Sequence, residues 1–183
     1  LLKNPKSDVT VLLITFFLTV IFDLTVAIEV GLVIACVLFM KRVMETTKIS
    51  VITDEIDPNK ESDIAVHEEN LIIPKGVEVY EINGPYFFGI ATKFEETMTQ
   101  LGDRPKVRII RMRKVPFIDS TGIHNLTTLC EMSQKEKTTV ILSGVNENVH
   151  NVLEKAGFYE LLGKENICPN INVALERAKS LVK

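Results

Sequence analysis

Apolar residues follow two different patterns along this chain, and the patterns change near residue 43. Residues 9–22 and 26–40 are almost continuously apolar, and Asp23, Leu24 and Thr25 separate the two runs. From Gly76 onward, short apolar runs alternate with segments whose apolar residues recur every three or four positions. The first pattern is typical of helices surrounded by lipid or protein. The second is typical of an α/β domain.

The two N-terminal runs predict an antiparallel helical hairpin. A single helix from Val9 to Met40 would be about 48 Å long at ~1.5 Å per residue, whereas the apolar core of a bilayer is about 30 Å thick. It would also bury Asp23 or Glu29 near its middle, at roughly 2.5–3.5 kcal/mol for each charge. We therefore expect two helices, with Asp23 and Glu29 marking the turn between them.

Basic residues flank this hairpin on both sides. Lys3 and Lys6 precede the first run, and Lys41 and Arg42 follow the second. The positive-inside rule then places both ends in the cytoplasm. A signal peptide fits poorly, because there are two apolar cores with charged flanks. Each run is short for a full crossing and the first residue is Leu1, so we expect a fragment whose neighbouring helices are missing.

An acidic segment follows the hairpin. Residues 43–76 hold eight acidic and three basic side chains, a net charge of -5. The first part, to about Ile52, is predicted to continue the second helix, and residues 53–70 read as a solvated connector. His67 lies beside two glutamates there, and we expect it to be inert.

Alternating elements fill the rest of the chain. Strands are predicted over residues 77–82, 86–90, 106–115, 138–145 and 165–169, and helices over 91–102, 120–137, 146–158 and 170–182. This order implies a mixed, largely parallel central sheet covered by helices. The inward residues are predicted to be Ile123, Leu126, Leu129, Cys130 and Met132 in one helix, and Val149, Val152, Leu153 and Ala156 in the next, which Gly157 ends.

The motif Asp119-Ser120-Thr121-Gly122 lies where a predicted strand meets a predicted helix. Asp119 or Ser120 could cap the helix through a side-chain oxygen. The free N–H groups of the first turn could bind an anion, and a glycine without a Cβ atom would let a phosphate or the backbone of another molecule approach. A phosphate added to one of the two hydroxyls would place ~1.5–2 negative charges at the helix N-terminus. Capping, anion binding and phosphorylation all remain open on the residues alone.

Catalytic and metal-binding patterns are lacking in the sequence. There is no Walker-type glycine-rich loop, no useful pair of carboxylates, and no nucleophile partner for His67, His124 or His150. Three widely spaced cysteines form no metal or redox motif. We therefore expect no enzyme, no catalytic residue, no cofactor and no metal.

A basic cluster follows the first predicted helix of the C-terminal part. Its members are Arg104, Lys106, Arg108, Arg111, Arg113 and Lys114. A solvated strand edge is one interpretation, and attraction to anionic headgroups or to an acidic cytosolic protein is the other. Nucleic acid is disfavoured, because residues 77–183 carry a net charge of only +1.

These motifs together resemble a known family. The run FIDSTGIHNL between an apolar strand and an apolar helix resembles the signature loop of STAS domains, the fold of the anti-sigma-factor antagonists. The run VILSGV with the helix after it resembles the next two STAS elements. The N-terminal FFLTVIFDLTVAIEVGLVIACVLFMKRV resembles the last two transmembrane helices of SulP-type anion permeases, in which a cytoplasmic STAS domain follows.

The resemblance implies three segments and a function. Residues 1–43 would be the transmembrane hairpin that ends a permease domain, 44–76 an acidic linker, and 77–183 the STAS domain. The whole would be the C-terminal portion of a multi-pass secondary transporter in the plasma (inner) membrane, for sulfate, bicarbonate or dicarboxylates. Its partners would be the bilayer, the remainder of the permease domain and a second copy in a homodimer, but no nucleic acid.

The resemblance also points to a regulatory loop. In the antagonist branch the hydroxyl directly before the motif glycine is the phosphoacceptor. That position is Thr121 here, and Ser120 precedes it. We therefore hypothesise a regulatory surface at Ser120 and Thr121. The alternative function is a membrane-tethered STAS switch with no transport activity.

Overall fold

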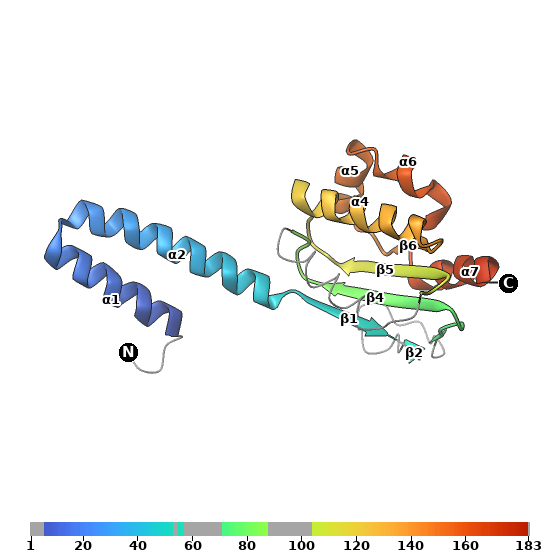
Figure 1. Ribbon diagram of the computed structural model, residues 1–183, viewed down its shortest axis with the longest axis horizontal. Coiled ribbons are helices and arrows are strands. Elements are labelled where there is room, and N and C mark those ends of the chain that lie inside the picture. Colours follow the sequence, from blue (N-terminus) through green and yellow to red (C-terminus); the bar gives the residue numbers. More distant parts are fainter. Residues whose placement is uncertain (1–5, 53–54, 57–70, 88–103, 183) are drawn as a thin grey trace. The chain divides into compact units, whose positions relative to one another are not determined.

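The chain forms two compact units, Leu1–Thr46 and Thr47–Lys183. A computed structural model describes residues 6–52, 55–56, 71–87 and 104–182. In chain order the elements are α1 (Lys6–Ile21), α2 (Leu24–Thr46), β1 (Lys48–Ile52), β2 (Glu55–Ile56), β3 (Leu71–Ile72), β4 (Val77–Asn83), β5 (Val107–Lys114), α4 (Ser120–Lys135), β6 (Thr139–Ser143), α5 (Glu147–Lys155), α6 (Phe158–Leu162), η2 (Lys164–Asn166), β7 (Ile167–Cys168) and α7 (Ile171–Val182) (Figure 1).

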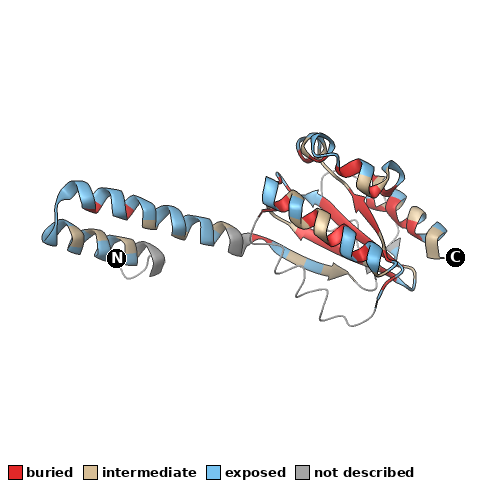
Figure 2. Cartoon of the chain, turned by 45° about the horizontal axis from the view of Figure 1, so that its top comes forward, coloured by how far each residue is buried: buried red, intermediate tan, exposed pale blue. Residues whose placement is uncertain are grey.

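The first unit is a hairpin of two packed helices, as the sequence predicted. Ala27 is fully buried against α1, and a Cβ atom on Gly31 would lie 2.7 Å from the Thr15 hydroxyl oxygen. Small residues therefore let the two backbones approach closely. Most other side chains of both helices are exposed and apolar (Figure 2). The Leu24–Val43 segment of α2 is long and apolar enough to cross a membrane, whereas the apolar part of α1, Val9–Ile21, is shorter.

The second unit is built on a five-stranded sheet in the order β1-β4-β5-β6-β7. Strands β4 to β7 are parallel, and only β1 runs antiparallel, beside β4. Since β4 to β7 follow one another across the sheet without reversal, their carboxyl ends all meet at one edge. The largely parallel, mixed sheet predicted from the alternation of elements is confirmed.

Helices cover both faces of this sheet. On one face, Tyr80, Ile110 and Leu142 pack in one apolar core with Leu126 of α4 and Leu153 of α5. On the other face α7 contributes Ala174, Leu175 and Ala178, which pack against residues of β4, β5 and β6. Both cores belong to Thr47–Lys183, so this unit has the apolar interior of an independent domain.

The chain after the hairpin differs from the prediction that a helix continues to about Ile52. α2 ends at Thr46, and Lys48–Ile52 forms β1. The pairing Lys48↔Asn83 to Ile52↔Val79 places Ile49 and Val51 against the core on the α4 side of the sheet. β-branched residues that can pack on a sheet favour a strand over a continued helix.

Several smaller predictions were wrong at single positions. Met132 and Ala156 are exposed, although both were predicted to face inward. Within the predicted strand 86–90, Tyr86 forms only an isolated bridge with Ile118. Residues 88–90 and the predicted helix 91–102 lie outside the described residues, as do residues 57–70 of the connector, which include His67. The short helix α6 was not predicted from the sequence. It begins directly after Gly157, where a positive φ of 70° ends the preceding helix α5.

Candidate functional site

Three loops meet at the carboxyl edge of the sheet. Residues 84–87 follow β4, residues 115–119 follow β5, and residues 144–146 follow β6. Backbone hydrogen bonds tie the loop after β4 to β5 and to the loop that follows it, because Tyr86 N donates to Phe117 O at 3.0 Å and Gly84 N donates to Lys114 O at 3.2 Å. The predicted loop Asp119–Gly122 therefore lies at the edge where sites form in α/β folds.

Asp119 caps α4, which begins at Ser120. The Oδ1 atom of Asp119 accepts a hydrogen bond of 2.6 Å from Gly122 N. Ile123 N donates to the backbone oxygen of Asp119 at 2.9 Å. Of the two capping candidates, Asp119 is the cap, and Ser120 is the first residue of the helix. The N–H group of Gly122 is thus already used within the chain.

Gly122 is required by the chain itself and not by a ligand. It is buried, and a Cβ atom at this position would lie 2.4 Å from Tyr86 O and 2.9 Å from Ile118 Cγ1. The sequence interpretation, that this glycine lets a phosphate approach, is therefore wrong. The missing side chain lets the first turn of α4 rest directly on the backbone of residue 86.

Ser120 and Thr121 are both exposed on the first turn of α4. Their side chains lie on the solvent side of a capped helix N-terminus, where added negative charge is stabilised by the helix dipole. A modifying enzyme could reach either hydroxyl without unfolding the helix. Their role as phosphoacceptors stays a prediction.

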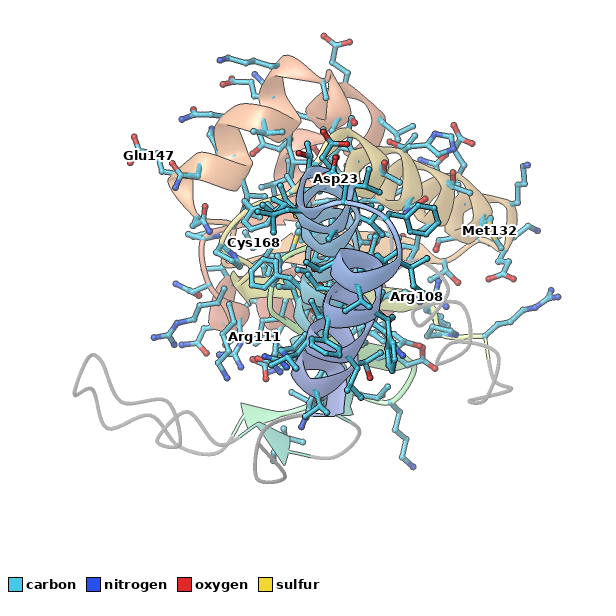
Figure 3. All side chains as sticks on the ribbon, turned by 90° about the vertical axis from the view of Figure 1, so that its left-hand side faces the viewer. Asp23, Arg108, Arg111, Met132, Glu147 and Cys168 are labelled. Atoms are coloured by element: carbon cyan, nitrogen blue, oxygen red, sulfur yellow. The ribbon has the colours of Figure 1, made fainter. Side chains whose placement is uncertain are left out.

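The predicted basic surface is divided by the fold. Arg108 and Arg111 are buried, with exposed fractions of 3% and 7%, so including them in a surface was wrong. Arg108 donates to Ser133 Oγ at 2.7 Å and lies 4.0 Å from the carboxylate of Glu78. Arg111 forms an ion pair of 3.0 Å with Glu81. Since strand side chains alternate between faces, one guanidinium lies on the α4 side and the other on the α7 side (Figure 3).

The four other cations of this cluster are exposed, but they lie at opposite edges of the sheet. Arg104 and Lys106 precede β5, while Arg113 and Lys114 end it. Because β5 is eight residues long, about 25 Å at ~3.3 Å per residue separates the two pairs. Only Arg113 and Lys114 share the carboxyl edge with the Asp119–Gly122 loop.

The two acidic residues of the hairpin differ in position. Asp23 lies between α1 and α2, and its Oδ1 atom accepts a hydrogen bond of 2.8 Å from Thr25 N. It therefore marks the turn, as predicted. Glu29 is inside α2, where it is exposed, so its assignment to the turn was wrong.

Sequence reasoning missed a groove at the opposite edge of the sheet. It has a volume of about 290 Å³ and is lined by Cys130, Gln134, Lys137, Thr138, Thr139, Val140, Leu162 and Asn166. Burial raises the pKa of the Cys130 thiol to about 12. A thiol with this pKa is protonated at neutral pH, so Cys130 is a poor nucleophile. No spacing motif in the sequence signals this groove.

One polar contact between helices was also missed. The side chains of His150 in α5 and Tyr159 in α6 share a hydrogen bond, and burial raises the pKa of Tyr159. His150 therefore has a structural partner on the neighbouring helix. Among the residues that the structure describes, no three His, Cys, Asp or Glu side chains group as a metal site.

Comparisons with known proteins agree with this fold. The STAS domain family matches residues 70–174. The crystal structure of a sulfate transporter family protein from Wolinella succinogenes is similar to this chain, with a TM-score of 0.58 and a sequence identity of 45%. The match covers 61% of this chain and 92% of that one. The STAS domain of a SulP transporter from Vibrio cholerae is 35% identical, with a TM-score of 0.55, over 60% of this chain and 86% of that one.

A longer match includes the hairpin. YvdB of Bacillus subtilis (strain 168), provisionally named a sulfate transporter, is 28% identical over 91% of this chain. The chain spans only 29% of the length of that relative. The exposed loop, the capped helix and the five-stranded sheet, together with these matches, lead to one conclusion. The chain belongs to the STAS domain family and corresponds to the C-terminal region of SulP-type sulfate transporters.

Proposed function

We propose that this chain is the C-terminal portion of a SulP-type secondary anion transporter, in which the STAS domain is a cytosolic regulatory and interaction module. One observation carries the proposal: an apolar helical hairpin directly precedes a STAS fold, and a transporter-named relative matches 91% of the chain, beyond the STAS residues. The transported anion would belong to the sulfate, bicarbonate or dicarboxylate class.

In this proposal both helices of the hairpin cross the plasma (inner) membrane. The 20 residues from Leu24 to Val43 are about 30 Å long at ~1.5 Å per residue, which matches an apolar bilayer core. Basic residues on both sides of the hairpin favour cytoplasmic ends. The exposed apolar side chains of α1 and α2 would contact lipid and the remainder of the permease domain.

The assignment of segments follows from the same proposal. Residues 1–43 would end the permease domain, 44–76 would be the linker, and 77–183 would be the STAS domain. β1 is then the part of the linker that pairs with the STAS sheet. A homodimer of the whole transporter is part of the proposal.

Transport is tested with the complete gene product that contains this chain. We expect purified protein in proteoliposomes to take up at least one of three radiolabelled anions, namely sulfate, bicarbonate and a dicarboxylate. Liposomes without protein are the control. If none of the three anions is transported although protease protection confirms insertion of α2, the transport proposal is wrong.

The second candidate is a membrane-tethered STAS switch, which the exposed Ser120 and Thr121 favour. It is tested by phosphopeptide mass spectrometry of protein from native cells. Phosphate on either residue, together with an absence of anion uptake, would support the switch. Uptake that responds to a Thr121→Glu substitution would instead make the loop a regulator of transport.

A further inference from the structure

One side of the carboxyl edge combines basic side chains with an exposed aromatic ring. Lys48 pairs with Asn83, which in turn pairs with Lys114, so these residues form a row across β1, β4 and β5. Neighbouring strands are ~4.8 Å apart, which places the Lys48 and Lys114 backbones about 10 Å from each other. Arg113 precedes Lys114, and the bond from Tyr86 N to Phe117 O fixes Phe117 beside the same loops.

All four of these side chains reach solvent. Lys48 and Arg113 are exposed, the Lys114 side chain is 45% exposed, and Phe117 is 52% exposed. The Phe117 ring stacks on Phe87, with centroids 6.4 Å apart and planes 18° apart. Stacking holds the ring in place at the surface. We call Lys48, Arg113, Lys114 and Phe117 the aromatic–basic edge.

Acidic residues also lie near this edge, but their charges are partly engaged. Glu81 pairs with Arg111 and with Lys114. Asp119 caps α4, and Glu147 is in the first turn of α5, where the helix dipole partly offsets its charge. The strand pairing places the backbones of Lys48 and Lys114 in a row across the sheet. Such a row matches an extended anionic surface better than a single small anion.

The covalent chain connects this edge to the apolar segment of α2 through only a few residues. β1 begins at the carboxyl edge because it is antiparallel to β4 (Figure 1). Thr47 is 1% exposed, and its hydroxyl donates to Pro85 O at 3.4 Å, so the chain is already anchored there when it leaves α2. The apolar segment of α2 ends at Val43. Five residues span at most ~18 Å, so the chain limits how far the edge can lie from the end of the apolar segment.

We propose that the aromatic–basic edge binds the anionic headgroups of the bilayer that α2 crosses. The cations would contact lipid phosphates, and the Phe117 ring would insert at the headgroup level, where aromatic residues are enriched in membrane proteins. This proposal rests on the proposed function in one respect only, the insertion of α2. It names a lipid-binding site of the STAS unit itself.

The test is photo-crosslinking of the full chain reconstituted in bilayers with and without anionic phospholipid. A benzoylphenylalanine replaces Phe117 in one variant, Met132 in a second and Phe39 in a third. Met132 is a matched control, because it is 41% exposed but lies twelve residues after Ser120, the first residue of α4, about 18 Å along the helix at ~1.5 Å per residue. Phe39, 66% exposed on α2, reports insertion of the helix.

We expect lipid adducts at positions 39 and 117 and few at position 132. The adducts at position 117 should require anionic lipid and should decrease with salt. The triple substitution Lys48→Gln, Arg113→Gln, Lys114→Gln should lower their yield, by about fivefold for each charge if each cation contributes as in typical polybasic segments. The adducts at position 39 should not change.

Each contrary outcome has a distinct meaning. Without lipid adducts at position 39, α2 is not inserted and the proposed function fails. With adducts at position 39 but none at 117, or with adducts at 117 that are insensitive to lipid charge and salt, the headgroup proposal is wrong. Adducts at 117 to a second copy of the chain or to another protein would also overturn it and make the edge a protein interface.

Discussion

At the scale of single residues, the candidate loop is shaped by one absent side chain. There is no space for a Cβ atom at Gly122, because this atom would lie only 2.4 Å from Tyr86 O. A glycine in such a loop suggests a ligand when only the sequence is available. In the folded chain the space is filled by the polypeptide itself, and the exposed chemistry of the loop is confined to the two hydroxyls before the glycine.

We expect Gly122→Ala to destabilise the Thr47–Lys183 unit by about 1–3 kcal/mol, because the new methyl group displaces either α4 or the loop at Tyr86. Urea denaturation of residues 47–183, followed by circular dichroism, measures this. Ser120→Ala is the control, since the Ser120 side chain is exposed. A Gly122→Ala variant as stable as the control would show that α4 does not rest on residue 86.

Arg108 within β5 and Arg104 before it provide a second test at this scale. Arg108→Leu removes the hydrogen bond to Ser133 and also removes the guanidinium that lies 4.0 Å from the carboxylate of Glu78. We expect a loss of about 2–4 kcal/mol. Arg104→Leu, the same change at an exposed position, should stay within about 0.5 kcal/mol. Equal effects in the urea denaturation midpoints would contradict the burial of Arg108.

At the scale of elements, the two helices of the carboxyl edge begin in similar ways but are tied differently to the sheet. Asp119 caps α4 through Gly122 N, and Asn146 caps α5 through Val149 N. The amide of Asn146 also donates to Val115 O in the loop before α4. One side chain therefore links the β6–α5 turn to the β5–α4 loop.

This difference predicts unequal costs of removing the caps. Asp119→Ala should lower the free energy of unfolding by about 1 kcal/mol, the usual cost of one cap. Asn146→Ala loses a cap and a loop contact, so about 2 kcal/mol is expected. Asn146→Asp keeps the capping oxygen and loses only the donor, so its stability in thermal denaturation should fall between wild type and Asn146→Ala. An Asn146→Asp variant equal to Asn146→Ala would assign the whole effect to the loop contact.

At the scale of the whole molecule, the second unit begins at Thr47 and not at the first strand of the STAS pattern. β1 covers the outer edge of β4 and adds Ile49 and Val51 to one core and Ile52 to the other. An uncovered β4 would expose a row of unpaired backbone groups. The five residues after the hairpin therefore belong structurally to the sheet.

We expect residues 47–183 to unfold in one cooperative step in urea, and residues 77–183 to be less stable by roughly 3 kcal/mol, from the partial exposure of three aliphatic side chains. The uncovered strand should also promote aggregation, which light scattering detects. A fragment of residues 53–183 is the control, because it keeps the connector and lacks only β1. If residues 53–183 are as stable as 47–183, β1 does not contribute to the domain.

The sequence alone determined the elements whose patterns are local. A nearly continuous apolar run interrupted at Asp23 specifies two helices, because a single helix through both runs would bury this charge near its middle at a cost in free energy. Period-two and period-four spacings gave most strands and helices after Gly76, and the Asp-Ser-Thr-Gly motif marked the helix start and the family. These features depend on neighbours within a few positions, which the sequence displays directly.

Only the tertiary structure decided features that depend on residues far apart in the chain. Lys48–Ile52 is a strand because β4 lies beside it, and Gly122 is a glycine because Tyr86 approaches from 36 positions earlier. Six neighbouring cations separate into two buried arginines and two exposed pairs at opposite edges, because side chains alternate across a strand and β5 passes through the centre of the sheet. A charge pattern along the sequence therefore becomes a surface only after the fold has selected which of its members reach solvent.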